Sequence, residues 1–548
     1  MSWRRRRFLR VASEGALLVG ASACRRREGT ETPDAKEGKT VTATTPLPDD
    51  LPPPPPPRFL HGVASGDPLA DRVIVWTRVE PLEGETQVHV AWVVALDPEL
   101  RQVVRSGVVE TGTWRDFTVK VDAEGLSPGT RHWYGFVVDG VQSPVGRTKT
   151  LPVGEVERAR FAVASCSNLP FGFFTGYAHV AARDELDFVL HLGDYLYEYA
   201  DGVYGAGEEI GRVATPPGEL VSLEDYRGRH ACYKRDADLQ TLHAAHPMIA
   251  VWDDHELANN AYWEGAQNHQ EDTQGAWGPR RDAAVQAYRE WMPIREVYAD
   301  ERPQLYRRFA VGELFELFML DTRLRGRAAQ PRRDEKRWAK AERELLGAAQ
   351  LGWLREALER STAKWRVLGQ QVLMAPLRRP DGEPVLLDTW DGYPKERDAI
   401  YDLFASLSLD PFVVLTGDIH SSWANELRRS PYARRPGSLL GVEFVTPGIT
   451  SPGLGGFWPE DAPSIDTVNP HMRWTEFGHR GYLEVEISAA RVEARWWHLL
   501  DVRVPAAPEF LAARFAFERD GSQLVGEAFG PPVAAPTESP STDAATSE

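Results

Sequence analysis

The chain has 548 residues, 42% of them hydrophobic, and it should fold as more than one unit because a single hydrophobic core rarely grows beyond about 250–300 residues. Its 63 lysines and arginines are outnumbered by 80 aspartates and glutamates, so the formal net charge at pH 7 is -17. This balance argues against a nucleic-acid-binding body. It also requires any phosphate-binding site to obtain positive charge locally, from arginines or metal ions.

Residues 1–24 form a predicted export signal. The stretch Arg5-Arg-Arg-Phe-Leu-Arg10 resembles the twin-arginine consensus, and the apolar run that follows it, residues 15–23, is too short to span a bilayer permanently. We therefore expect the twin-arginine machinery to export the folded chain to the periplasm, the cell surface or the medium. The alternative is a basic tail beside a weakly hydrophobic helix.

Cys24 stands at the end of this signal. Residues 21–24 resemble a bacterial lipoprotein cleavage site, although Ala21 occupies the position where leucine is usual. A lipid on Cys24 would anchor the protein to a membrane, and the sequence does not decide whether Cys24 is lipidated. The chain has three cysteines in all, too few for a disulfide scaffold. Of the other two, we expect Cys232 to be structural, and Cys166 is considered below.

Two low-complexity segments lack the apolar residues that would offset the entropy of ordering them. Residues 25–57 are charged and rich in threonine and proline, and they end in six consecutive prolines. Residues 531–548 are mostly proline, alanine, serine and threonine without periodicity. We expect the first segment to be a disordered linker, stiff at its proline end, and the second to be a disordered tail.

Residues 58–152 read as a small β-sandwich. Short alternating apolar runs at 73–77, 88–92 and 133–138 are separated by turn-rich glycine, proline and aspartate. Residues 126–134 resemble the strand-entry segment of fibronectin type III modules, with Tyr134 at the corner. Aromatic core packing explains these residues, so we expect no chemistry from this unit.

From residue 158 to 505 the pattern changes to apolar strands that alternate with helical stretches, which is typical of an α/β architecture. Strands are predicted at 161–164, 188–192, 248–252, 314–320, 365–372 and 412–415, and helices at 174–184, 351–360 and 395–406. Residues 506–530 are interpreted as a C-terminal extension. Ligands in such folds bind beyond the carboxyl ends of the strands.

Four of these predicted strands end in polar clusters: Ala164-Ser-Cys-Ser-Asn168, Gly193-Asp-Tyr-Leu-Tyr-Glu198, Asp253-Asp-His-Glu256 and Gly417-Asp-Ile-His-Ser-Ser422. A single aspartate at a strand end is commonplace, because aspartate favours turns and helix starts. Four clusters delivered to one edge of the sheet are different, since converging carboxylates repel one another unless they are protonated or bound to cations. The sequence therefore predicts a metal site.

These motifs resemble the alkaline phosphatase D (PhoD) family of metallophosphoesterases, over roughly residues 59–504. The resemblance rests on these four clusters together with His61-Gly-Val-Ala-Ser-Gly-Asp-Pro68, Leu320-Asp-Thr-Arg323 and Trp390-Asp-Gly-Tyr393, all in the family's order. It implies a four-layer αββα sandwich of α/β class, preceded by the small fibronectin III-like sandwich. It also implies a centre with one ferric ion (Fe³⁺) and two calcium ions (Ca²⁺).

The resemblance assigns metal ligands by position. Cys166 stands where the family has an iron-ligating thiolate, and Tyr197 matches its phenolate ligand; both anions suit a trivalent Lewis acid. Asp194 would bridge metals, and Asp418 and His420 match the closing motif. Without the resemblance, a buried thiol such as that of Cys166 would be read as a small hydrophobic residue.

The motif at residues 252–256 supplies the remaining assignments. Asp254 and His255 stand where related phosphoesterases have an Asn-His pair, and the histidine usually acts beside the phosphate. Asn259 or Asn260 could add a hard oxygen ligand to calcium, and the sequence does not choose between them. Arg323 and Arg397 are candidate phosphate clamps, because a planar guanidinium binds two phosphate oxygens at once; the alternative for each is a structural ion pair.

The resemblance implies hydrolysis of phosphate monoesters, diesters or both by a metal-activated water, with His255 protonating the leaving alkoxide. No nucleophile elbow (G-x-S-x-G), Walker loop or GxGxxG turn occurs in the chain. Two alternatives stay open. One is a phospholipase D-like or teichoic-acid-type phosphodiesterase, and the other is a non-catalytic surface protein that binds metal and phosphate.

Overall fold

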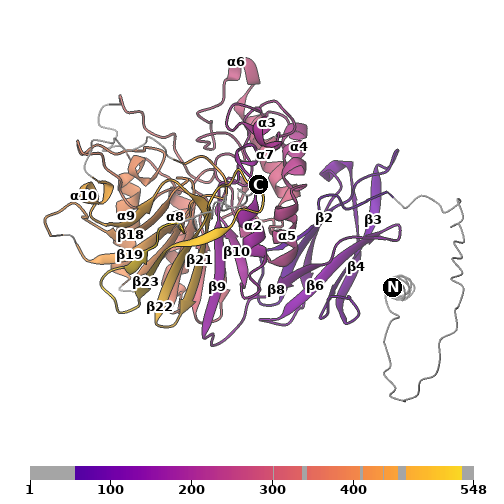
Figure 1. The fold of residues 1–548 in the computed structure, drawn as a ribbon, viewed down its shortest axis with the longest axis horizontal. Coiled ribbons are helices and arrows are strands. Elements are labelled where there is room, and N and C mark those ends of the chain that lie inside the picture. Colours follow the sequence, from indigo (N-terminus) through magenta and orange to yellow (C-terminus); the bar gives the residue numbers. More distant parts are fainter. Residues whose placement is uncertain are drawn as a thin grey trace, which may run out of the picture.

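The computed structural model describes residues 56–299, 302–335, 342–407, 411–435, 437–453 and 464–532. The predicted signal with Cys24, almost all of the predicted linker and residues 533–548 lie outside the described residues. Among the described helices, none has the length and apolar character that crossing a membrane requires. The fold is mixed α/β, and its two large sheets stand side by side in Figure 1.

The first large sheet has ten strands in the order β24-β23-β22-β21-β9-β10-β11-β1-β2-β5. The strands are β1 (Val63–Gly66), β2 (Arg72–Arg78), β5 (Thr118–Glu124), β9 (Arg158–Ala164), β10 (Phe188–His191), β11 (Met248–Ala250), β21 (Arg480–Ser488), β22 (Arg491–Leu499), β23 (Glu509–Glu518) and β24 (Val525–Ala528). At its centre β9, β10 and β11 are parallel, so their carboxyl ends lie at one edge.

The second large sheet has seven strands in the order β14-β15-β16-β17-β19-β18-β20. They are β14 (Arg307–Val311), β15 (Phe315–Met319), β16 (Trp365–Gln370), β17 (Phe412–Thr416), β18 (Ser422–Arg428), β19 (Leu439–Val445) and β20 (Met472–Glu476). Strands β15, β16, β17 and β19 run parallel to one another. A separate pair is formed by β12 (Tyr298–Ala299) and β13 (Arg302–Pro303).

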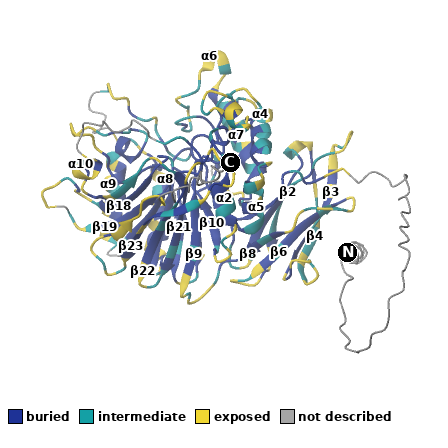
Figure 2. Ribbon diagram, viewed as in Figure 1, coloured by how far each residue is buried: buried dark blue, intermediate teal, exposed yellow. Residues whose placement is uncertain are grey.

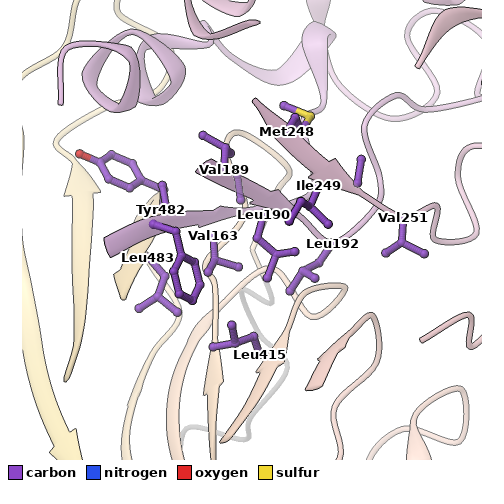
Figure 3. Packing of buried hydrophobic residues seen from close by; sticks show 14 of the residues in the cluster. Val163, Val189, Leu190, Leu192, Met248, Ile249, Val251, Leu415, Tyr482 and Leu483 are labelled. Atoms are coloured by element: carbon purple, nitrogen blue, oxygen red, sulfur yellow. The ribbon is translucent and has the colours of Figure 1, made fainter. Parts of the chain in front are cut away.

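A continuous apolar core joins the two large sheets. Buried residues of β9, β10 and β21 belong to the same cluster as Leu415 of β17, and Figure 3 shows these side chains together around Leu190 and Leu192. Burial of apolar area on this scale is the main stabilising contribution to the fold. Figure 2 shows the same region as a buried interior with exposed residues confined to loops and outer faces.

Helices pack against both large sheets. Residues on the other face of β15, β16 and β17 pack with α8 (Gly347–Arg360) and α9 (Pro394–Ser406) in a second cluster. Beside the ten-stranded sheet, Figure 1 groups α2 (Thr175–Ala181), α4 (Leu223–Tyr233), α5 (Ala237–Ala245) and α7 (Trp277–Trp291). The short helices are α3 (Gly207–Ile210), α6 (Glu271–Gln274) and α10 (Ile465–Val468).

The N-terminal unit is less separate than the sequence suggests. Its five-stranded sheet contains β3 (Gln87–Ala95), β4 (Val103–Gly112), β6 (Arg131–Val138), β7 (Val141–Gln142) and β8 (Gly146–Lys149). This sheet shares an apolar core with β2 and β5. Those two strands and β1 extend the ten-stranded sheet through the parallel β1–β11 pair, so the N-terminal unit and the rest of the chain share one sheet.

Every strand and helix named in the sequence analysis is present, with ends shifted by a few residues. The predicted extension at 506–530 contributes β23 and β24, which pair along the edge of the ten-stranded sheet. The expectation that all four polar clusters share one sheet edge is wrong. Three follow β9, β10 and β11, whereas the fourth follows β17 of the other sheet, and stacking of the two sheets brings the clusters together.

Candidate metal centre

Strained backbone marks the ends of these strands. Cys166, Asp194, Asp418 and His420 have φ angles of 58°, 54°, 61° and 49°, in the left-handed region that residues with a Cβ rarely adopt. Each such conformation costs about 1–3 kcal/mol and persists where the surrounding structure determines it, often at functional sites. The strained residues are four of those that the sequence singles out as metal ligands.

Cys166, Asp194 and His420 form the first candidate ligand group. Each offers one ligand atom, and these atoms lie within 4.8 Å of one another. Tyr197 completes the group, because its hydroxyl donates to Asp194 Oδ2 at 2.9 Å and lies 3.1 Å from His420 Nε2. Ser451 Oγ lies 2.5 Å from the same hydroxyl and donates to it. Sulfur, carboxylate, phenol and imidazole thus converge on one point.

The protonation of Cys166 and Tyr197 would change if a cation bound beside them. Burial, followed by the charge of Asp194, raises the pKa of both the Cys166 thiol and the Tyr197 phenol well above their usual values. Both groups therefore hold their protons when no positive charge is near. A bound cation reverses this preference, because it stabilises the thiolate and the phenolate directly.

Two further ligand groups adjoin the first. Asp194, Asp254 and His255 form one, and Asp253, Asp254 and Asp418 form the other, again with ligand atoms within 4.8 Å. Asp194 belongs to two groups and Asp254 belongs to two, so the three groups form a connected series. This arrangement fits a centre with more than one metal ion, in which carboxylates bridge neighbouring ions.

Unpaired oxygens support the same interpretation. Asp194 Oδ1, Asp254 Oδ1 and Asp253 Oδ2 are buried, and none has a hydrogen-bond partner within the part of the chain that the structure describes. A buried carboxylate oxygen without a partner is costly unless a cation binds it. The oxygens, sulfur and nitrogen collected here therefore fit metal ions, with hard oxygens near Asp254 and softer donors near Cys166.

Arg323 lies inside the carboxylate cluster. Its guanidinium is fully buried and donates to Asp253 at 2.5 Å, to Asp388 at 2.8 Å and to Asp418 at 3.0 Å. Burial raises the pKa of Asp418 to about 7 although Arg323 opposes this shift. For Asp254, Arg323 and His255 outweigh burial and lower the pKa. The ion pair that the sequence analysis gave as the alternative for Arg323 is the interaction seen.

Arg397 lies elsewhere. It belongs to α9 and donates to Asp391 at 2.6 Å and to the Met374 carbonyl at 3.4 Å. Its described partners are thus those of a structural ion pair, and they do not include the residues of the three ligand groups. The structure brings Arg323 to the candidate centre and pairs Arg397 with Asp391.

The carboxylate of Glu198 holds His255 in place. Its Nδ1 lies 2.8 Å from Glu198 Oε2, while Glu198 Oε1 accepts the backbone N–H of Asn259 at 2.7 Å. Burial alone would lower the pKa of His255, but Asp254 and Glu198 outweigh it and raise the pKa well above its usual value. The imidazole is therefore oriented and charged when the surrounding carboxylates carry no cation.

The two asparagines have different surroundings. The backbone N–H of Asn260 donates to Asp254 Oδ2 at 2.6 Å, and its side-chain amide, oriented with nitrogen toward Asp388, lies 3.2 Å from that carboxylate. Asn259 is fixed through its backbone N–H to Glu198. Both side chains are partly exposed, and the choice between them as a metal ligand stays a prediction.

Several residues of the centre were not assigned a role from the sequence. Glu256 accepts the backbone N–H groups of Asp194, Tyr195 and Asp253 at 3.1, 2.7 and 2.8 Å, so it ties two of the loops together. Asp388 lies two residues before the Trp390 motif, which could have pointed to it. Ser451 lies after β19, and no pattern in the sequence marks it.

Comparisons with known proteins identify the family of the chain. Residues 161–496 match the family model described as PhoD-like phosphatase, and residues 47–152 match the model of that family's N-terminal domain. Alkaline phosphatase D of Bacillus subtilis (strain 168) is 38% identical over 485 residues, which cover 85% of this chain and 82% of that protein. A solved structure of PhoD has a TM-score of 0.79 and 35% identity, covering 86% of this chain and 93% of the other.

Proposed function

Because the chain belongs to the PhoD-like phosphatase family and is a homologue of alkaline phosphatase D, we propose that it is an exported, metal-dependent phosphoesterase acting on phosphate monoesters, diesters or both. The main evidence for metal dependence is the series of three ligand groups that share Asp194 and Asp254. It is supported by the buried Asp194 Oδ1, which has no hydrogen-bond partner among the described residues, and by Asp254 Oδ1, which has none either and lies 3.6 Å from Arg323. Carboxylates so placed repel one another, and cations offset that repulsion.

We assign the ions by the chemistry of their donors. Cys166 and Tyr197 would hold Fe³⁺, because thiolate and phenolate are electron-rich anions that suit a trivalent ion, and His420 and Asp194 would complete its shell. Asp254, Asp418 and an asparagine oxygen would hold Ca²⁺, which prefers hard oxygen ligands. Asp194 would bridge the two kinds of ion.

When bound, the metal ions supply Lewis-acid activation of water and neutralise the charge of the phosphate. The protein's own residues do the rest. His255, oriented by Glu198 beside Asp194 and Asp254, is placed to protonate the leaving alkoxide. Arg323 positions Asp253 and Asp418 and lowers the repulsion between them. It therefore acts on substrate through these carboxylates.

We propose three further features of the family for this chain, which concern its layered fold, its N-terminal sandwich and its export. Helices α8 and α9 on one side, the two packed sheets, and α2, α4, α5 and α7 on the other support a four-layer αββα arrangement. The shared core of the five-stranded sheet with β2 and β5 supports a fibronectin III-like N-terminal sandwich. Export by the twin-arginine route, and a lipid on Cys24, rest on residues 1–24 alone.

A direct assay tests the proposed function. The purified chain, loaded with iron and calcium, is offered a chromogenic monoester and a matched diester, before and after treatment with a chelator. We expect turnover that the chelator removes and that added metal restores, and the two substrates give the preference. An inactive metal-loaded protein would favour the non-catalytic alternative, and turnover that survives complete metal removal would contradict metal dependence.

A further inference from the structure

A second group of metal-type ligands lies outside the centre described above. It consists of Glu476, His479 and His498. Glu476 is the last residue of β20 in the seven-stranded sheet, and His498 belongs to β22 in the ten-stranded sheet. His479 lies in the short connection between β20 and β21. The group therefore joins the two large sheets at one place.

The spacing of these atoms suits a tetrahedral ion. His479 Nδ1 lies 3.0 Å from Glu476 Oε1, and His498 Nδ1 lies 3.7 Å from Glu476 Oε2. The three ligand atoms all lie within 4.8 Å of one another. Zinc binds nitrogen and oxygen at about 2.0–2.2 Å, so two of its tetrahedral ligands are about 3.3–3.5 Å apart. With one oxygen of Glu476 as its ligand atom, adjustments of the side chains would bring the three atoms from within 4.8 Å to that distance.

His498 provides the independent indication of a ligand. Its side chain is fully buried, and its Nδ1 has no hydrogen-bond partner among the described residues. The other ring nitrogen, Nε2, lies 2.9 Å from Ser422 Oγ. If Nε2–H donates to this hydroxyl, Nδ1 carries its lone pair toward Glu476. Metal-binding histidines are commonly fixed in this way through their second nitrogen.

A purely structural role explains only part of the group. Glu476 accepts the backbone N–H groups of Gly478 and His479, which accounts for its carboxylate as the cap of a tight turn. Phe510 packs edge-on against both histidine rings. Neither contact gives His498 Nδ1 a hydrogen-bond partner, and Glu476 Oε2, at 3.7 Å, is too far away to be one.

We propose that Glu476, His479 and His498 bind one Zn²⁺ ion, with water as the fourth ligand, and that this ion links β20 to β22. Two histidines and one glutamate with an open position form an established zinc ligand set. Glu476 and His479 are partly exposed, with relative side-chain exposures of 26% and 31%, so the ion has a route of entry.

The test counts bound Zn²⁺. The full chain, with iron and calcium already in its main centre, is titrated with Zn²⁺ against a chromogenic chelator. We expect wild type to bind one more equivalent of Zn²⁺ than His479→Ala, whose partly exposed position makes the variant safe for folding. Ser422→Ala should weaken this equivalent about 10–100-fold, the usual effect of removing such a supporting hydrogen bond. Substituting Co²⁺ should give the visible absorption of a four-coordinate site in wild type and not in His479→Ala.

A matched control is available on the N-terminal sheet. His89 and Glu110 form an exposed pair at 3.2 Å and belong to none of the candidate ligand groups among the described residues. His89→Ala should therefore bind as much Zn²⁺ as wild type. Equal Zn²⁺ binding by wild type and His479→Ala would overturn the proposal, and so would an equal loss in His89→Ala. Because the readout is Zn²⁺ bound at this group, the result is independent of the proposed phosphoesterase activity.

Discussion

The phenol of Tyr197 donates a hydrogen bond to Asp194 Oδ2 over 2.9 Å, three residues away in the loop that follows β10. This contact places the Tyr197 oxygen beside a carboxylate that also faces His420, at 3.7 Å from its Nε2. Loss of that proton would leave a phenolate beside a carboxylate, and a bound cation would offset the repulsion between these two anions. The protonation of Tyr197 is therefore coupled to the charge of Asp194.

The first prediction concerns the aspartates that hold the metals. Asp194→Asn or Asp418→Asn should abolish hydrolysis and lower the metal content, because each replaces a charged ligand by a neutral one of the same size. Folding should be retained, since the substitution relieves repulsion among buried carboxylates. Activity, elemental analysis and thermal unfolding of the same preparations check this. A variant with full metal content and wild-type turnover would contradict the assignment of its aspartate.

The second prediction concerns colour. If Cys166 and Tyr197 both bind Fe³⁺, the loaded protein should show a visible charge-transfer band, because electron-rich ligands donate into an oxidising ion. Tyr197→Phe should shift or remove the phenolate component, and Tyr199→Phe is the matched control on a neighbouring ring. An active, colourless preparation without iron would point to a zinc or calcium-only centre.

Arg323 allows a prediction about stability. Replacing it by methionine leaves Asp253 and Asp418 buried without their cation, and loss of one partner of a buried pair costs about 3–5 kcal/mol. We expect this loss in the metal-free protein and a smaller one after metal loading, because bound ions supply the missing charge. Denaturant unfolding with and without metal measures both. The exposed pair of Arg360 and Glu356 gives the control, and Arg360→Met should change stability by about 0–1 kcal/mol.

Much of the fold could be predicted from the sequence, because alternating and continuous apolar runs identify strands and helices locally. The pairing of those strands could not. The Gly66 to Met248 pairing, which joins the N-terminal unit to the ten-stranded sheet, connects residues far apart in the chain and leaves no local pattern. The same is true of β17, whose membership in a second sheet depends on which strands pair with it.

Some residues of the candidate site are marked by sequence motifs, and others are revealed only by the fold. Asp194, Asp254 and His420 are recognisable because each follows an apolar strand within a dense polar motif, whereas Cys166 is recognisable only through its resemblance to the family motif. Ser451 and Glu198 act through contacts with Tyr197 and His255 that only the folded chain creates. Arg323 was recognised as an arginine near the site, but its partners are acidic residues from three other segments, which spacing cannot reveal.

A fourth prediction concerns pH. Lys234 is buried beside Tyr195 and His243, and burial lowers its pKa to about 7. An unfolded lysine keeps its proton up to about pH 10.4. Between these values the unfolded state binds more protons than the folded state, so this group makes stability rise with pH, by up to about 1.4 kcal/mol per unit. Below pH 7 the folded protein carries the full penalty of a buried charge.

Lys234→Met should remove this rise of stability with pH. Unfolding of wild type and variant is measured between pH 7 and 9, where the difference in their free energies of unfolding should change by about 1–3 kcal/mol. The matched control is Lys395→Met, at a partly exposed position on α9, which should follow wild type. Parallel pH profiles for wild type and Lys234→Met would show that Lys234 keeps an ordinary pKa in the folded protein.

The last prediction concerns export. A centre whose ligands extend from Cys166 to His420 can retain its metals only after the chain has folded, and this suits transport in the folded state. Changing residues 4–7 from arginine to lysine keeps the basic charge that a general secretion signal needs but removes every arginine pair in that run. We expect active precursor to accumulate in the cytoplasm, measured as phosphoesterase activity in separated fractions. Replacing a single arginine is a poor test, because the four consecutive arginines could supply a shifted pair. Normal export of the fourfold lysine variant would exclude the twin-arginine route and leave the general secretory route in its place.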